Sequence, residues 1–311
     1  MRGMGAELAG GLMCNLVGRD EYWSVMKVTR LILLAVMVVL GGCSGAQKTG
    51  EIAIIERVRG ADAETRHFYF QGSNEEVSRG WALLLPGSSG LTILGDSEHY
   101  FLAADVLNQH GFDALVVDYK AAYRAAKDRP DVETGGKIAW VAGRAVEWAE
   151  ESGFIEEGTP GAIVAWSLGS EGVWAMGNAG GDAFARLGIL GAVVYYPSVE
   201  RAVESGGIRE LEIPTLVLSG EADDVTTLGA IRRALSELSG DGIEIVAYPG
   251  AYHGFDVRSI GEMKQMRFPP IIGERVTFGF DADVSADAEL RMVRFLERVM
   301  AQEYPGNGRQ P

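Results

Sequence analysis

The sequence predicts an α/β domain built on a doubly wound, mostly parallel sheet with helices on both faces. Short apolar runs alternate with amphipathic helical segments from about residue 81 to residue 300, which is typical of a parallel sheet with crossover helices. Three polar residues, Ser167, Asp223 and His253, each come directly after one of the apolar runs. Ligands bind beyond the carboxyl ends of parallel strands. We therefore expect these three side chains to meet at one edge of the sheet.

The first 43 residues are interpreted as an upstream extension followed by a lipoprotein signal peptide. A charged segment, 26–30, precedes ten apolar residues, 31–40, which form too short a run to span a bilayer. The run ends in Leu40-Gly41-Gly42-Cys43, which resembles a bacterial lipobox with Cys43 as the lipidated residue. Ser44 then resembles the Gram-negative signal for outer-membrane sorting. We expect a lipid anchor in the bacterial cell envelope, facing the periplasm; an ordinary signal peptide cleaved nearby is the alternative.

The rest of the chain is expected to hold one domain, 51–302, between a polar tether, 44–50, and a C-terminal tail, 303–311. The formal net charge is −15, without a basic stripe, which argues against nucleic acid as a partner. The only two cysteines, Cys14 and Cys43, precede the domain. A disulfide and a cysteine nucleophile within the domain are therefore excluded, and covalent acyl chemistry would need a hydroxyl group.

The elements expected before Ser167 are strands and helices in alternation after an antiparallel pair. The segment 120–136 is polar and no regular element is expected there. The loop 86–90 offers backbone N–H groups that are not paired with a neighbouring strand, although a plain turn would have the same sequence. The expected strands are 51–58, 66–70, 81–85, 114–117 and 162–166, and the expected helices are 96–110 and 137–151.

The elements expected after Ser167 continue the alternation and end in a helix whose inward face includes Leu290, Val293 and Leu296. The segment 257–283 lacks periodicity and forms either a pocket wall or lid, or a surface excursion over the sheet edge. The expected strands are 191–196, 215–218 and 243–248, and the expected helices are 169–176, 226–238 and 286–300.

Ser167 stands where an apolar strand turns into a helix, in the sequence Ala165-Trp166-Ser167-Leu168-Gly169. A serine on such a turn is held in a strained conformation with its hydroxyl exposed, which is the nucleophile elbow. The alternative is that Ser167 only caps the following helix. Ala165 takes the place of the usual first glycine and adds one methyl group at a close approach of helix and strand.

Hydrolysis through a serine needs an acid and a base in addition to the nucleophile. A hydroxyl is a weak nucleophile at neutral pH, so an imidazole must take its proton, and His253 is the candidate base. A carboxylate must orient that imidazole, and Asp223 is the candidate, with Asp224 and Glu221 as alternatives. A helix-start carboxylate is the other interpretation of Asp223. The chain order Ser, Asp, His is the one described for α/β-hydrolases.

The tetrahedral oxyanion needs two donors, for which we nominate the backbone N–H groups of Leu168 and Ser88, with Ser89 as the alternative to Ser88. His67, His99 and His110 are the only other histidines and are interpreted as surface or capping residues. The sequence has no metal-binding histidine spacing and no phosphate-binding loop, so neither a metal nor a cofactor is predicted.

Three segments resemble the dienelactone hydrolase family of the α/β-hydrolase superfamily, over about residues 80–300. Its acid loop is similar to Gly220-Glu-Ala-Asp-Asp224, its histidine loop to Tyr248-Pro-Gly-Ala-Tyr-His-Gly-Phe-Asp256, and its oxyanion loop to Leu85-Pro-Gly-Ser-Ser-Gly90. The resemblance implies the α/β-hydrolase fold and hydrolysis of an ester, thioester or amide through an acyl-enzyme. The chain departs from the family at Pro86, where many relatives carry histidine, and at Ser167, where the founding members carry cysteine.

The sequence therefore predicts an envelope-anchored serine hydrolase that acts on a small-molecule acyl substrate, a carboxylic ester in the first place. The alternative is a lipoprotein without turnover that keeps the α/β-hydrolase scaffold as a binding module.

Overall fold

The computed structural model describes residues 53–56, 66–75, 77–180, 182–236, 238, 242–267 and 275–301. The chain divides into two compact units, Met1–Gln47 and Lys48–Pro311, and every described residue belongs to the second. The expected signal peptide, the lipidation site at Cys43, the tether and the C-terminal tail lie outside the described residues. None of the described helices is both long and apolar enough to cross a membrane.

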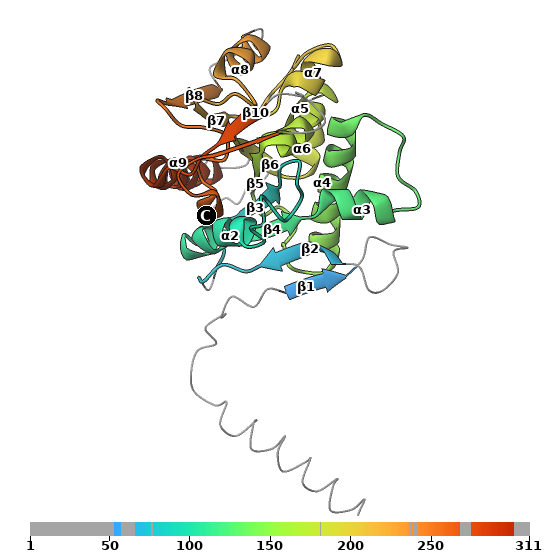
Figure 1. Cartoon of the computed structure of the whole chain (residues 1–311). Helices are drawn as coiled ribbons and strands as arrows, with labels where there is room; N and C mark the ends of the chain where they lie inside the picture. Colours follow the sequence, from blue (N-terminus) through green and yellow to red (C-terminus); the bar gives the residue numbers. More distant parts are fainter. Residues whose placement is uncertain are drawn as a thin grey trace, which may run out of the picture. The chain divides into compact units, whose positions relative to one another are not determined.

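An eight-stranded sheet in the order β1-β2-β4-β3-β5-β6-β7-β8 forms the centre of the second unit (Figure 1). The strands from β3 to β8 pair in parallel, whereas β2 is antiparallel to both of its neighbours, β1 and β4. This confirms the predicted doubly wound, mostly parallel sheet. The strands are β1 Ala53–Glu56, β2 Arg66–Gln71, β3 Trp81–Leu85, β4 Asp113–Val117, β5 Gly161–Trp166, β6 Ile189–Tyr195, β7 Thr215–Gly220 and β8 Ile243–Tyr248.

Helices cover both faces of the sheet, because the strands are apolar on both sides. In β3, Leu83 and Leu85 pack on the face covered by α4, α5 and α8, while Ala82 and Leu84 pack on the face covered by α2 and α9. The helices are α2 His99–Gln109, α3 Tyr119–Ala125, α4 Thr134–Glu151, α5 Ser170–Asn178, α6 Asp182–Arg186, α7 Glu200–Glu204, α8 Leu228–Leu235 and α9 Ala282–Met300, with 3₁₀ turns at η1 Ser167–Gly169 and η2 Arg258–Ile260.

Several elements were not predicted, among them α3, α6, α7, η2, β9 and β10. Helix α3 lies in a segment with no clear periodicity and is capped by Asp118, whose carboxylate accepts the Ala121 N–H at 2.9 Å. The segment 257–283 contains η2 and an antiparallel pair, β9 Lys264–Arg267 and β10 Arg275–Phe278. Strand β9 is mostly polar, and neither strand is one of the continuous apolar runs by which the parallel strands of the main sheet were predicted.

The prediction for Leu290 was wrong. Its side chain is 44% exposed, whereas Val293 and Leu296 face the core as expected. Leu290 lies two residues from the buried Met292, which places it roughly 200° around the helix from the packed stripe.

Candidate active site

Ser167 follows β5 directly and adopts a strained backbone conformation with φ +46°. Such a conformation is rare for residues other than glycine and persists only where the surroundings hold it. Here the Ser167 carbonyl accepts hydrogen bonds from the Ser198 N–H at 3.0 Å and the Ser170 hydroxyl at 2.5 Å. The N-cap residues of η1 and α5 are Trp166 and Gly169, so Ser167 is not a helix cap. The turn has the geometry of a nucleophile elbow.

The second glycine of the elbow is required by packing, and the first is not. A Cβ atom on Gly169 would lie 2.2 Å from the Leu85 carbonyl oxygen and 2.7 Å from that of Pro86, and neither backbone oxygen can move aside easily. Ala165, which replaces the usual first glycine, is accommodated in the core with no exposed surface. The elbow therefore tolerates the methyl group at position 165.

We expect Gly169→Ala to lower the free energy of unfolding by about 1–3 kcal/mol, because the added methyl group overpacks β3 against the elbow. The matched control is Gly143→Ala on α4, where a Cβ would meet no atom within 4 Å. That change should stabilise the helix by about 0.5–1 kcal/mol. Urea unfolding of both variants measures the difference, and equal effects of the two substitutions would contradict the packing explanation.

Ser167, His253 and Asp223 form a hydrogen-bonded chain across three strand ends. The Ser167 Oγ lies 3.2 Å from His253 Nε2, and His253 Nδ1 lies 2.8 Å from Asp223 Oδ2. An ionised carboxylate can only accept, so the Nδ1 proton points to Asp223 and Nε2 is left to accept the serine proton. Both Asp223 and His253 are buried. The structure thus brings together the three residues that the sequence singled out.

Asp223 is fixed by further donors, whereas its two neighbouring carboxylates point elsewhere. Its Oδ1 accepts the N–H groups of Val225 and Thr226, each at 2.8 Å, and the Thr226 hydroxyl lies 3.0 Å from Oδ2. Asp224 instead accepts the Thr277 N–H at 2.9 Å. Glu221 is exposed. Of the three carboxylates considered from the sequence, Asp223 is the one that contacts the imidazole.

The loop after β3 passes beside the nucleophile. A Cβ on Gly87 would lie 3.5 Å from the Ser167 Cβ. The Gly87 N–H donates to the Tyr100 hydroxyl at 3.0 Å, and the Tyr119 hydroxyl donates to the Gly87 carbonyl at 3.1 Å. Because the Gly87 N–H is already used, the next amide, that of Ser88, is the better candidate for an oxyanion donor.

The other candidate donor, the Leu168 N–H, belongs to the first turn of η1. The N–H groups of a first turn have no partner inside their own helix, so they can bind an anion. Lys120 donates to the Ser88 carbonyl and so helps to hold the loop that carries the second donor.

Two aromatic rings enclose the His253 imidazole. The Tyr196 ring lies 4.4 Å from it between centroids, and the Phe278 ring lies 5.3 Å away at an interplanar angle of 87°. Phe278 belongs to β10, so the segment after the histidine loop forms part of the wall of the site, which was one of the two expectations. Neither ring was predicted. Tyr196 follows β6 directly in the structure, whereas the sequence placed it inside the expected strand 191–196.

Two of the other histidines were interpreted wrongly. His67 on β2 and His99 on α2 are 3% and 7% exposed, so they are core residues, and only His110 lies at the surface. His99 Nε2 lies 3.6 Å from Asp256 Oδ2. Histidine occurs both inside and outside proteins, so an isolated one in a strand or a helix does not show its burial in the sequence.

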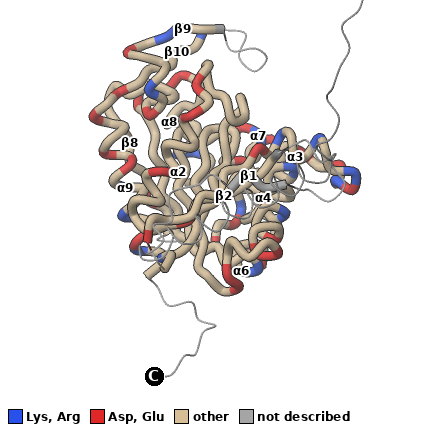
Figure 2. The backbone as a smooth tube through the Cα atoms, turned by 90° about the horizontal axis from the view of Figure 1, so that it is seen from below, with Lys and Arg blue, Asp and Glu red and all other residues tan. Residues whose placement is uncertain are grey.

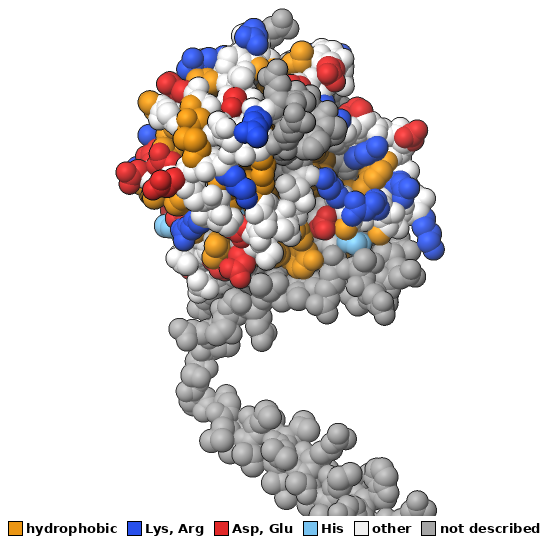
Figure 3. All heavy atoms as spheres, viewed as in Figure 1, with side chains coloured by type: hydrophobic (Ala, Val, Ile, Leu, Met, Phe, Trp, Pro, Cys, Tyr) orange, Lys and Arg blue, Asp and Glu red, His pale blue; other side chains and the backbone are white. Residues whose placement is uncertain are grey.

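Basic residues gather on α3 and the segment after it (Figures 2 and 3). Arg129 and Lys137 stand over the Tyr123 ring at 5.4 and 5.3 Å from its centroid. Because α3 follows the carboxyl end of β4, this group lies at the edge of the sheet that carries Ser167.

Glu171, on the first turn of α5, is a buried carboxylate beside the elbow. It is 2% exposed, and its Oε1 accepts the Ser198 hydroxyl at 2.6 Å and the Arg201 N–H at 3.2 Å. Burial raises the pKa of Glu171 from 4.5 to about 7, although both hydrogen bonds act in the opposite direction. Ser198 in turn donates to the Ser167 carbonyl, so Glu171 supports the elbow through one intermediate residue.

The raised pKa of Glu171 predicts a stability that depends on pH. The folded state binds the proton more tightly than the unfolded state, so the contribution is complete below pH 4.5 and is lost as the pH rises through about 7. Glu171→Gln keeps the acceptor oxygen and removes the titration. From acid to neutral pH, we expect the unfolding free energy of the wild type to fall by roughly 3 kcal/mol relative to this variant. The urea unfolding midpoints of both proteins, measured from pH 4.5 to 8, test this. A difference between the two midpoints that stays constant over this pH range would contradict the prediction.

The sequence model of the dienelactone hydrolase family matches residues 175–300. This range contains Asp223 and His253, and it begins after Ser167. Over these residues the chain is similar to the dienelactone hydrolase family, and its sheet has the strand order and helix layers of an α/β-hydrolase fold. This family match supports a hydrolase that acts on ester bonds. No curated protein matches it.

Solved structures share the fold of this dienelactone hydrolase-like protein. Dienelactone hydrolase from Anabaena variabilis has a TM-score of 0.53 at 17% identity, with 80% of this chain and 98% of that chain covered. A putative dienelactone hydrolase from Klebsiella pneumoniae has a TM-score of 0.52 at 17% identity, with 76% and 94% covered. Thermogutta terrifontis esterase 2 has a TM-score of 0.53 at 15% identity, with 82% and 96% covered.

Proposed function

We propose that this dienelactone hydrolase-like protein is a serine hydrolase that cleaves a small carboxylic ester through an acyl-enzyme. The observation that supports it is the continuous contact from the Ser167 hydroxyl through the His253 imidazole to the Asp223 carboxylate, at 3.2 and 2.8 Å. The strained backbone of Ser167 supports the same assignment, because backbone strain concentrates at active sites.

In the proposed reaction, Ser167 Oγ attacks the acyl carbon while its proton passes to His253 Nε2. Asp223 holds the Nδ1 proton and stabilises the imidazolium. The Leu168 and Ser88 N–H groups bind the oxyanion of the tetrahedral intermediate. Nε2 then returns the proton to the departing alkoxide, which leaves as the alcohol. The same imidazole then takes a proton from a water molecule, which attacks the acyl carbon. As the bond to Ser167 Oγ breaks, Nε2 returns the proton to Oγ and the acid is released.

Covalent labelling tests the nucleophile directly. One of the solved structures shows the Thermogutta esterase phosphorylated by paraoxon. The same organophosphate is therefore a suitable probe for this chain. We expect one diethylphosphoryl group on the peptide that contains Ser167, with none on Ser167→Ala or on heat-denatured protein. A folded protein that paraoxon does not modify, yet that binds ester analogues without turnover, would instead favour the binding-module alternative.

We also propose that the protein is anchored in the outer membrane through lipid on Cys43 and faces the periplasm. The support is the sequence Leu40-Gly41-Gly42-Cys43 after a short apolar run. Expression of the full chain in a Gram-negative host with labelled palmitate should give a labelled protein in the outer-membrane fraction. Cys43→Ser should lose both the label and the fractionation, and a labelled Cys43→Ser protein would contradict the anchor.

A further inference from the structure

Tyr196 is a strained residue that the proposed reaction does not use. It is buried and adopts φ +36°, which for a bulky side chain is an outlier that needs support from its surroundings. Its ring lies 4.4 Å from the His253 ring at an interplanar angle of 56°. The strain therefore places an aromatic side chain against the catalytic base.

The strained conformation is held from both the backbone and the phenol. The Tyr196 N–H donates to the Leu218 carbonyl at 2.7 Å, and its own carbonyl lies 3.0 Å from the Thr226 hydroxyl, which is shared with Asp223 Oδ2 at the same distance. The phenol donates to Asp256 Oδ1 at 2.7 Å. Burial raises the pKa of the Tyr196 phenol well above its usual value, so the group remains protonated and can donate.

The Asp256 carboxylate connects three parts of the site. Its Oδ1 binds the Tyr196 phenol, and its Oδ2 accepts the Trp166 indole N–H at 2.7 Å. Trp166 precedes Ser167 directly, and Asp256 follows His253 by three residues. One carboxylate thus joins the strand that carries the nucleophile, the loop that carries the base and the ring that packs on the base.

We propose that Tyr196 and Asp256 are positioning residues for the reaction. Asp256 holds the Tyr196 ring so that it fixes the plane of the His253 imidazole, and through Trp166 it fixes the strand end that presents Ser167. This inference rests on the proposed serine hydrolase function and adds to it two residues that act through His253 and Ser167.

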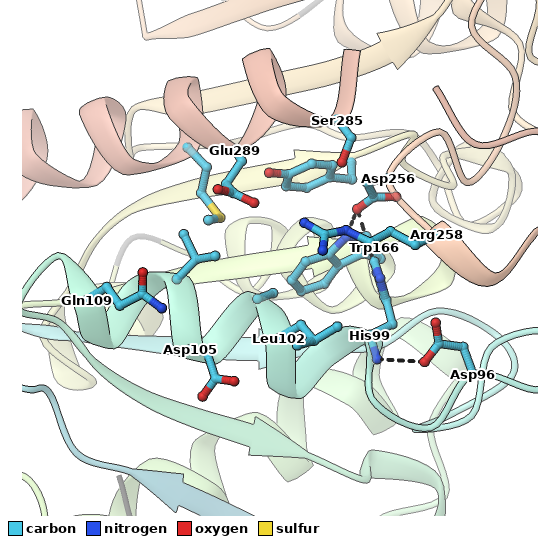
Figure 4. Close-up of a pocket in the computed structure, with 14 residues that line it drawn as sticks. Asp96, His99, Leu102, Asp105, Gln109, Trp166, Asp256, Arg258, Ser285 and Glu289 are labelled. Atoms are coloured by element: carbon cyan, nitrogen blue, oxygen red, sulfur yellow. Dashed lines mark hydrogen bonds and ion pairs between the residues drawn. The ribbon is translucent and has the colours of Figure 1, made fainter. Parts of the chain in front are cut away.

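A cavity of about 350 Å³ is lined by Asp256 and Trp166, while Tyr196 does not line it (Figure 4). It lies between α2 and α9 and is lined by exposed residues such as Asp105 and Gln109, while neither Ser167 nor His253 lines it. His99 Nε2 lies 3.6 Å from Asp256 Oδ2, and Arg258 lines the same cavity. Both side chains would favour an anion at this position. A small solute can therefore enter the space that Asp256→Ala would leave.

The first test compares two neighbouring buried tyrosines. Tyr196→Phe removes the hydroxyl that binds Asp256, and Tyr195→Phe removes one that donates to the Ala288 carbonyl at 3.3 Å. We expect Tyr196→Phe to lower kcat for a nitrophenyl ester by about ten-fold or more at unchanged KM, since small misplacements of catalytic groups cost rate. Paraoxon labelling of Ser167 should slow in parallel. Tyr195→Phe should keep the wild-type kcat and the wild-type rate of paraoxon labelling. Its thermal midpoint should change by about as much as that of Tyr196→Phe.

The second test is chemical rescue of Asp256→Ala. We expect the kcat of this variant to be about 100-fold below that of the wild type. Added formate should raise the kcat of the variant several-fold, because formate can accept the hydrogen bonds of Trp166 and Tyr196 in place of the lost carboxylate. Formamide, of similar size but uncharged, should restore much less. Equal rescue by the two solutes, or full activity of Asp256→Ala, would overturn the inference. If Asp256→Ala does not fold, the pair of tyrosine variants decides.

The outcomes separate this inference from the function on which it rests. An active wild type in which Tyr196→Phe and Tyr195→Phe have equal kcat values overturns the positioning role alone. A folded wild type that neither hydrolyses esters nor reacts with paraoxon overturns the proposed function and the positioning role with it.

Discussion

Replacement of His253 by alanine is expected to lower kcat for ester hydrolysis by about 10⁶-fold, close to the loss expected for Ser167→Ala. The reason is that, among the described residues, Nε2 is the only imidazole nitrogen that contacts the serine oxygen, at 3.2 Å, and can take the proton that must leave. Because the two residues act as one unit, the double variant should be no slower than either single variant. Initial rates with a nitrophenyl ester of short acyl chain measure all three.

His110→Ala is the control for the loss of a histidine, since that side chain lies at the surface. It should leave kcat and KM unchanged. A His253→Ala variant that retains more than a few per cent of the wild-type kcat would contradict the proposed role of His253, provided that its near-ultraviolet dichroism shows the native fold.

The residues of the triad could be predicted from the sequence because each lies just beyond an apolar strand. Ser167 follows its strand directly, and Asp223 and His253 follow theirs after a short turn. In a parallel sheet the carboxyl ends of the strands share one edge, so sequence position alone brings Ser167, Asp223 and His253 to the same region. The fold was predictable for the same reason, since strands buried on both faces leave continuous apolar runs such as β3 and β6.

The residues that surround the triad could not be predicted in the same way. Asp256 acts through contacts with Trp166 and Tyr196, which are 90 and 60 positions away in the sequence. A tyrosine at the end of a buried strand is a common core residue, and only its positive φ distinguishes Tyr196. Contacts between distant segments depend on how helices and loops pack on the sheet, which the local pattern does not encode.

The orientation of the imidazole is expected to depend on one carboxylate of an adjacent pair. Asp223→Asn replaces the acceptor of the Nδ1 proton by an amide that can present its N–H₂ group instead, which favours the wrong tautomer of His253. We expect kcat to fall by about 10⁴-fold with the fold intact. The Oδ1 atom, which accepts the Val225 and Thr226 N–H groups at 2.8 Å, is kept as the amide oxygen, so the acid loop retains its conformation.

Asp224→Asn is the matched control, because it makes the same chemical change one residue further on. Asp224 accepts a hydrogen bond from the backbone of Thr277 on β10 and does not contact His253. Its amide oxygen can accept the same bond, so kcat should change by less than about three-fold, within the range of a neutral surface substitution. Losses of similar size in the two variants would mean that the pair acts through the total charge of the acid loop, and the assignment of Asp223 as the orienting residue would then fail.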